Sequence, residues 1–306
     1  MLKKILLAIG AVLAIGVVVL AFILVPAHLQ IRAVEPELPT KAELLALADD
    51  PNGPTKISYF ETSTQKSAEL SLTHSTFVVE WEDGRILLID LGMDAAVAVE
   101  FGALFETVAG ADPAVSLGTV PEIMGDDLDR VRGIGFTHLH QDHVQGIEPI
   151  CEARAASIAA LHTPDQISKH NLHTEEQSAM LTDSACVNQT ELTDGSRTTA
   201  EFPGIGIYPL GGHTPGSTMF AIPVEGKLWL LSGDISNSQN DLLNNRGKGF
   251  IYSYLMVPED VDRLEILRTW LIDLNNDPAI TALVSHDGKA LADSGIKQWQ
   301  RSSEQE

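Results

Sequence analysis

The sequence predicts a layered α/β domain, with sheets inside and helices outside, preceded by one apolar helix. Two β-hairpins with similar turns lie far apart in the chain, helical segments lie between and after them, and residues 5–25 carry no charge. Hairpins and helices mixed along one chain bury their apolar faces in stacked layers. The chain has 306 residues and is 44% hydrophobic, which suffices for one large domain or two small ones.

The N-terminal segment, residues 1–32, is typical of a membrane anchor. Lys3 and Lys4 precede an uncharged run from Ile5 to Val25, and about 20 apolar helical residues cross the roughly 30 Å core of a bilayer. Lysines before such a run stay in the cytoplasm. We therefore expect a transmembrane helix with the folded domain outside the cytoplasm, on the periplasmic side of the inner membrane in a bacterium.

A cleaved signal segment is the alternative for these residues, because residues 25–27 (Val-Pro-Ala) have the small-x-small character of a cleavage site. The apolar run exceeds the usual length of about 7–15 residues for a signal, which favours the uncleaved anchor. Cleavage would give a secreted protein, so both alternatives export the domain.

Residues 33–56 are expected to be a linker. They contain four prolines and the turn-rich run "DDPNGPTK", with one short helix expected in "KAELLALA", residues 41–48. The folded domain is expected to occupy residues 57–306.

The two hairpins are "FVVEWEDGRILLIDLG", residues 77–92, and "FAIPVEGKLWLLSGD", residues 220–234. Each has an acid–glycine–base turn, which suits a tight turn with positive φ, and each carries an aspartate near its end, Asp90 and Asp234. This similarity suggests two related β-rich halves, although hairpins also share turn chemistry by chance. We further predict a helix end and a short strand over residues 126–138, helices over residues 143–160 and 265–276, and a strand over residues 279–286.

Charge and cysteine content restrict the function. The chain has 20 basic against 42 acidic residues, a formal net charge of −22, which disfavours nucleic acid as a partner because its binders need a basic surface. Cys151 and Cys186 form no CxxC pair, which excludes a thiolate zinc or iron–sulfur site within the chain. A disulfide is possible in an exported domain, and two buried thiols are the alternative.

The run "GFTHLHQDHVQG", residues 135–146, concentrates titratable groups at the end of a predicted strand. His138 and His140 are two residues apart in an extended segment and point to one side. Asp142 is well placed to cap the following helix, and His143 comes next. Groups this crowded indicate a bound cation. Three more candidates follow predicted strands: His213 in "PLGGHTPGS", Asp234 in "LLSGD" and His286 in "LVSHDG".

These motifs and their order resemble the metallo-β-lactamase-fold hydrolases over about residues 57–292. The resemblance implies a four-layer αββα sandwich with two pseudo-symmetric halves and two zinc ions. One ion would be held by His138, His140 and His213, the other by Asp142, His143 and His286, with Asp234 bridging both. Zinc lowers the pKa of bound water to about 7, so we expect a metal-bridging hydroxide that attacks an ester, lactone or amide-type bond of a small molecule, with Asp142 as a catalytic residue.

The other polar groups receive lesser roles. Asp90 is expected to orient a ligating histidine through its second ring nitrogen, or else to have a structural role at the strand end. Surface or cavity-lining roles are expected for His162, His170 and His173, and structural roles for His28 and His74.

Several branches of the family stay open. Lactonases that open acylated homoserine lactones typically carry a tyrosine three residues after the bridging aspartate, where this chain has Asn237; Tyr252 or Tyr254 is a possible replacement. True β-lactamases of the similar subclass lack a bridging carboxylate, and glutathione thioester hydrolases are usually cytosolic. A mononuclear iron dioxygenase of the same fold and a non-catalytic metal-binding scaffold are the alternatives to a hydrolase. The sequence does not determine the oligomeric state.

Overall fold

The structure is a computed structural model that describes residues 2–67, 71–154, 156–192 and 199–304. Within these ranges the strands form two sheets. The larger has the order β12-β1-β2-β3-β5-β6-β7, with β4 paired to β1, and the smaller has the order β11-β10-β9-β8. The strands are β1 (Lys56–Lys66), β2 (Ser71–Glu80), β3 (Ile86–Ile89), β4 (Val115–Ser116), β5 (Val131–Gly135), β6 (Ile158–His162), β7 (Val187–Glu191), β8 (Gly206–Pro209), β9 (Thr218–Val224), β10 (Lys227–Leu231), β11 (Ile280–Leu283) and β12 (Lys297–Gln298).

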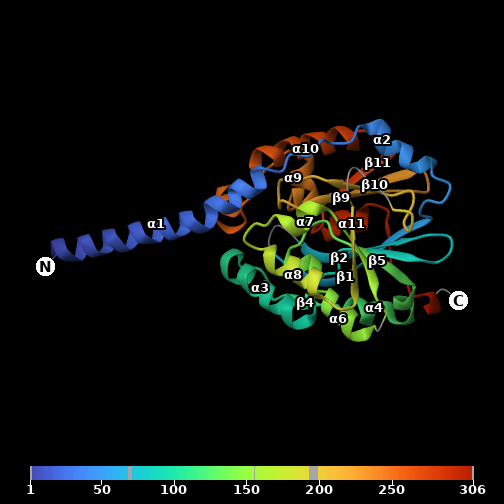
Figure 1. Cartoon of the computed structure of the whole chain (residues 1–306), viewed down its shortest axis with the longest axis horizontal. Helices are drawn as coiled ribbons and strands as arrows, with labels where there is room; N and C mark the ends of the chain where they lie inside the picture. The colour runs from blue at the N-terminus through green and yellow to red at the C-terminus, as the bar shows by residue number, and fades with distance from the viewer. Residues whose placement is uncertain (1, 68–70, 155, 193–198, 305–306) are drawn as a thin grey trace.

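Helices cover the outer faces of the two sheets (Figure 1). The larger sheet is covered by α4 (Val120–Met124), α6 (Ile147–Ala153) and α8 (Glu175–Asp183), and the smaller by α2 (Lys41–Leu45), α9 (Gln239–Leu243) and α10 (Val261–Asn275). The helix α3 (Ala95–Ala109) packs beside β1 and β4. The shorter elements are α5 (Gln141–Val144), α7 (Pro164–Ser168), α11 (Gly288–Asp293), η1 (Ala46–Asp49), η2 (Gly125–Arg130), η3 (Gly233–Ile235), η4 (Tyr252–Met256) and η5 (Ser302–Glu304).

Among the described residues, three buried apolar clusters fill the spaces between these layers. One includes Ile134 and Ile147 and joins the larger sheet to its helices. The second includes Phe77 and Phe220 and lies between the sheets, and the third joins the smaller sheet to α10. The predicted layered α/β arrangement is therefore present, because each sheet buries one face on the other sheet and one on helices.

Both predicted hairpins form, one in each sheet. β2 pairs with β3, and β9 pairs with β10, both antiparallel. The backbone takes positive φ at Gly84 (83°), and at Glu225 (53°) and Gly226 (75°). Two consecutive residues with positive φ are what a two-residue type I′ turn requires, so the acid–glycine pair of the second hairpin sets its turn directly.

The helix predicted over residues 143–160 is wrong in its second half. α6 ends at Ala153, and β6 pairs in parallel with both β5 and β7. The alanine-rich composition favours a helix, but β6 lies between two neighbouring strands, and burial there outweighs intrinsic propensity. The other predicted elements, over residues 126–138, 265–276 and 279–286, are present as η2 with β5, α10 and β11.

The N-terminal helix α1 (Leu2–Arg32) projects from the domain (Figure 1). Among the described residues it is the one helix whose length and apolar composition would let it cross a membrane. The segment after it lies against the domain: Val34 and Leu44 are buried, and Arg263 Nη2 donates to the Pro36 carbonyl (2.7 Å). The short helix expected at residues 41–48 is present as α2 and η1.

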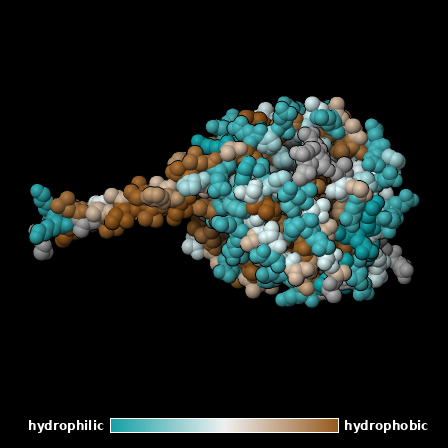
Figure 2. Space-filling model, in the orientation of Figure 1, coloured by the Kyte–Doolittle hydropathy of each residue, from teal (hydrophilic) through white to brown (hydrophobic). Residues whose placement is uncertain are grey.

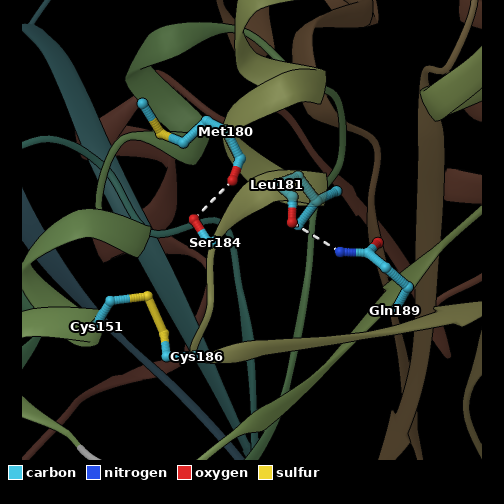
Figure 3. Close-up of a disulfide and its surroundings, with 6 residues drawn as sticks. All are labelled: Cys151, Met180, Leu181, Ser184, Cys186 and Gln189. Carbon is cyan, nitrogen blue, oxygen red and sulfur yellow. Dashed lines mark hydrogen bonds between the residues drawn. A yellow bond between two sulfur atoms is a disulfide. The ribbon is translucent and has the colours of Figure 1, made fainter.

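Cys151 and Cys186 form a disulfide, which decides between the two alternatives left open by the sequence. It joins α6 to the start of β7, with Cα atoms 5.4 Å apart (Figure 3). Nearby, Ser184 Oγ donates to the Met180 carbonyl (2.6 Å) and Gln189 Nε2 to the Leu181 carbonyl (2.7 Å). A crosslink that closes a loop of 35 residues stabilises a fold by about 3–4 kcal/mol through the unfolded chain.

Two glycines on β5 let aromatic rings of the inter-sheet core lie against the strand. A Cβ added to Gly133 would lie 2.5 Å from Cζ of Phe202, and one added to Gly135 would lie 2.7 Å from Cζ of Phe220. Both rings are buried, so neither can move away without disturbing the close-packed core.

We therefore expect Gly135→Ala to lower the free energy of unfolding by about 1–3 kcal/mol through overpacking, measured by urea denaturation. Gly247→Ala is the matched control, because an added Cβ there has its nearest neighbour at 3.9 Å, and its effect should stay within about 0.5 kcal/mol. Equal stabilities of the two variants would show that the ring of Phe220 does not constrain this strand.

Candidate metal centre

The seven side chains selected from the sequence converge where strands of both sheets end. His138 and His140 follow β5, Asp142 and His143 lie in α5, and the other three follow β8, β10 and β11: His213, Asp234 and His286. All seven are buried. Residues from four separate chain segments thus share one site, which is the arrangement that the sequence predicts.

The first group contains His138, His140 and His213. His138 Nε2 lies 3.0 Å from His140 Nδ1, and His213 Nε2 lies 3.2 Å from the same atom. Three ring nitrogens therefore face one point from two different loops.

The second group surrounds Asp142. Its Oδ2 lies 3.4 Å from His143 Nε2 and 3.2 Å from His286 Nε2, and these two nitrogens are 3.3 Å apart. Asp234 lies between the groups, because one carboxylate oxygen is 3.7 Å from His213 Nε2 and 3.1 Å from His286 Nε2. Its other oxygen is 3.8 Å from His143 Nε2.

The donor set fits zinc in kind and in spacing. Imidazole nitrogen and carboxylate oxygen are zinc ligands, and tetrahedral coordination with bonds of about 2.0–2.1 Å places ligand atoms about 3.3 Å apart. The separations above, 3.0 to 3.4 Å within each group, match this value. Asp234 Oδ1 is buried and has no hydrogen-bond partner among the described residues, which leaves it available to a cation.

Several histidines are held through the ring nitrogen that points away from the cluster. Asp90 Oδ2 lies 2.9 Å from His143 Nδ1 and also accepts a hydrogen bond from Thr137 Oγ1. His286 Nδ1 lies 2.9 Å from the carbonyl of Thr73. A fixed second nitrogen determines the tautomer and the orientation of the ring, and the expected orienting contact of Asp90 is present.

A buried ion pair holds His213 in the same way. Glu259 Oε1 lies 2.6 Å from His213 Nδ1 and 2.9 Å from Lys248 Nζ, and Ser253 Oγ donates to Glu259 Oε2 (2.6 Å). Burial opposes the charge on Glu259, but Lys248 and His213 outweigh it and lower the pKa of Glu259 to about 2. The carboxylate therefore stays ionised and accepts the Nδ1 proton of His213, which leaves Nε2 free to bind a cation.

The electrostatics of the cluster favour a cation as well. Burial lowers the pKa of both His138 and His140 well below the ordinary value, so these imidazoles are neutral and offer lone pairs. Burial opposes the charges of Asp142 and Asp234, yet the surrounding imidazoles lower the pKa of each carboxyl well below the ordinary value. Burial likewise opposes a charge on His286, but the two carboxylates raise its pKa to about 10, so a metal ion must displace a proton there.

A cavity of about 760 Å³ opens beside the cluster. His140, Asp142, Asp234 and His286 form its floor, and its walls are largely apolar, with Phe101, Leu104, Phe105 and Ala109 of α3, Leu72, Leu172, Met256 and Val257. This volume is typical of pockets that hold small molecules. Both Asn237 and Tyr252 line it, whereas Tyr254 faces away and stacks on Phe250.

Comparison with known families identifies this arrangement. Residues 71–303 match the family model of the metallo-beta-lactamase superfamily. The chain belongs to this superfamily. It is therefore a metal-dependent hydrolase by family. None of the curated proteins compared with the chain matches its sequence.

Solved metallo-beta-lactamase-fold structures show the same architecture. An N-acyl homoserine lactone hydrolase with the product N-hexanoyl-L-homoserine at its catalytic metal centre is 15% identical, with a TM-score of 0.57 over 82% of this chain and 98% of that one. The B. thuringiensis protein AiiA, a variant with N-decanoyl-L-homoserine at its active site, gives the same values. AidC, a dizinc quorum-quenching lactonase with a bound product, is 15% identical, with a TM-score of 0.52 over 78% and 92%. Identities this low show a shared fold alone.

Three features of this metallo-beta-lactamase-superfamily site differ from the expectations above. Asp142 does not cap its helix; His140 is the cap residue, and the Asp142 carboxylate turns to the histidines instead. His74 does not have a purely structural role, because its Nε2 lies 3.5 Å from Asp142 Oδ2 and it joins Asp142 and His286 in one candidate ligand group. The sequence does not predict that Glu259 and Lys248 belong to the site.

The remaining histidines lie outside the two groups. His173 lines the cavity, with its ring 5.9 Å from that of His140, which agrees with the expected lining role. The surface or lining role expected for His162 is wrong, because His162 is buried near the Thr163 carbonyl and does not line the cavity. The backbone N–H of His170 donates to Gln30 Oε1, and His28 packs on Tyr254.

We expect Glu259→Gln to weaken zinc binding by about 10–100-fold, the usual cost of losing the outer partner of a metal-binding histidine. The substitution removes the charge that holds His213 Nδ1 and leaves Lys248 unpaired. Competition with a chromophoric chelator measures the affinity. Glu265→Gln, at an exposed position of α10, is the control, and equal affinities of the two variants would exclude a role for Glu259 in the site.

Proposed function

We propose that this chain is a dinuclear zinc hydrolase that cleaves an ester, lactone or amide-type bond of a small molecule. The observation that carries the proposal is the pair of ligand groups with Asp234 between them. In this proposal His138, His140 and His213 hold one zinc ion, Asp142, His143 and His286 hold the other, and Asp234 contacts both. The spacing of these atoms supports two ions, because the donor atoms lie 3.0–3.2 Å apart at His140 in the first set and 3.2–3.4 Å apart in the second.

Different residues of the chain have different roles in the proposed hydrolysis. Bound zinc supplies a water of pKa near 7 and polarises the bond that is attacked. Asp142 has two roles in the proposal: it is a metal ligand, and its carboxylate orients the nucleophilic water at the cavity floor. Tyr252 lines the same cavity, and burial, followed by the carboxylates of Asp234, Glu259 and Asp142, raises its pKa well above the ordinary value. A phenol that keeps its proton can donate a hydrogen bond to the substrate oxygen on which charge develops.

The comparisons support a class of substrates and do not single out one compound. Proteins with the same fold hold the product N-hexanoyl-L-homoserine at a catalytic metal centre or N-decanoyl-L-homoserine at the active site, which supports a lactone or another small ester as the substrate. Asn237 stands where those lactonases typically carry a tyrosine, and Tyr252 is the residue positioned to replace it, because Tyr254 faces His28.

Export and membrane anchoring are part of the proposal. α1 has the length and composition of a transmembrane helix, and the Cys151–Cys186 disulfide suits an oxidising compartment outside the cytoplasm. We therefore place the catalytic domain outside the cytoplasm, held at the membrane by α1. Proteolysis of the domain by trypsin added to the outer side of the intact inner membrane supports this placement, and protection there contradicts it.

We expect the full chain in detergent to bind about two zinc ions, and Asp142→Ala to lose the activity by more than about 100-fold while keeping the wild-type circular dichroism spectrum. Tyr252→Phe should keep both zinc ions and lower kcat by about 100- to 1,000-fold, because it removes one hydrogen-bond donor to the developing charge. Zinc content by mass spectrometry and rates on lactones, β-lactams, thioesters and phosphodiesters provide the readouts.

The alternatives give different metal contents. One iron per chain would indicate the mononuclear dioxygenase, and a chain that stays metal-free in zinc buffer would remove the hydrolase proposal. Two bound zinc ions with no rate on any substrate class would favour the non-catalytic scaffold.

A further inference from the structure

Two segments that line the cavity, residues 250–257 and α3, also carry exposed apolar side chains, here called the rim. Phe250 and Ile251, directly before Tyr252 of the cavity wall, are 68% and 66% exposed, and Leu255, directly before Met256 of that wall, is also exposed. Leu104 of α3 lines the cavity itself while half of its surface faces solvent. Single exposed apolar residues are common, but a group of them around a cavity marks an interaction surface.

This rim adjoins the end of α1 that enters the domain. The ring of His28 lies 5.5 Å from that of Tyr254, and its Nε2 is 3.2 Å from the Tyr254 carbonyl. The backbone N–H of His170 donates to Gln30 Oε1 (3.0 Å), next to Leu172 of the cavity wall. α3 reaches the side of the domain from which α1 projects (Figure 1), and hydrophobic side chains continue from α1 onto this edge (Figure 2).

The length of α1 determines where the rim lies relative to the hydrocarbon core of the bilayer. The uncharged run from Ile5 to Val25 is about 32 Å long at 1.5 Å per helical residue, close to the roughly 30 Å thickness of a bilayer core. His28 is three residues further along, or about 4.5 Å above the end of this run. Tyr254, which contacts His28, and Phe250, which stacks on Tyr254, therefore lie at the level of lipid headgroups, where aromatic side chains are favoured.

We propose that this apolar rim rests on the lipid bilayer, so that the cavity opens to the lipid phase and takes an amphiphilic substrate from it. The inference rests on the proposed membrane anchoring by α1. Apolar contact carries the docking, because a chain of net charge −22 gains nothing from anionic lipids. The apolar walls of the cavity suit an alkyl or acyl chain, while the metal-binding floor meets the polar group of the substrate.

Tryptophan quenching tests the docking directly. The full chain is reconstituted into vesicles of phosphatidylcholine that carry bromine on its acyl chains, and Phe250→Trp, Leu104→Trp and Ile266→Trp are compared with the wild type. Side chains that enter the outer 5–10 Å of the bilayer lose at least about half of their added emission. Ile266 is 55% exposed on α10, over the smaller sheet, and its tryptophan should keep its emission.

The possible outcomes distinguish failure of the docking from failure of the proposed membrane anchoring. Flotation of the chain with vesicles tests the anchor alone: if the chain does not float, the anchoring proposal fails and the docking falls with it. If the chain floats but neither Phe250→Trp nor Leu104→Trp is quenched, the domain stands clear of the bilayer and the docking is wrong. Protection of both tryptophans from acrylamide as well as from brominated lipid would indicate a second copy of the chain on the rim, which also overturns the inference. None of these readouts depends on hydrolysis.

Discussion

The structure depends on one constraint, the burial of five histidines and two aspartates in a single cluster. These residues come from loops that follow strands of both sheets. Ring nitrogens and carboxylate oxygens approach to between 3.0 and 3.8 Å, away from solvent. Removing such charges from water costs several kcal/mol per ion unless each one finds a partner. The surrounding contacts offset part of this cost, because Asp90, the Thr73 carbonyl and Glu259 each contact the ring nitrogen of a histidine that points away from the cluster.

The sheets matter to the cluster because they bring distant loops to one edge. β5 in the larger sheet and β8, β10 and β11 in the smaller sheet all end there. The close approach at Gly133 and Gly135 brings the two sheets, and hence the two sets of loops, to their observed separation. A wider core would move His213 and Asp234 away from His138, so the packing between the sheets determines the distances within the site.

The sequence predicted the layered fold, both hairpins and the seven clustered residues because local patterns encode them. β-rich runs on both sides of an acid–glycine turn mark the hairpins, and His138, His140, Asp142 and His143 lie within one run. Glu259 was not predicted and His74 was expected to have only a structural role, because each stands alone in the chain. Only the fold brings His74 to Asp142 and Glu259 to His213. The error over residues 143–160 has a related cause: the residues of β6 favour a helix locally, and the neighbouring strands β5 and β7 decide otherwise.

The packing of α1 against the domain bears on how the polypeptide is processed. The helix continues through Pro26 to Arg32, with Ala27 and Ile31 buried. Peptidases bind their substrates as extended strands, so a cut after Ala27 would first require the last two turns to unwind and Ile31 to leave its apolar surroundings, at a cost of about 2 kcal/mol for that side chain alone. In the folded domain this packing would therefore oppose a cut after Ala27.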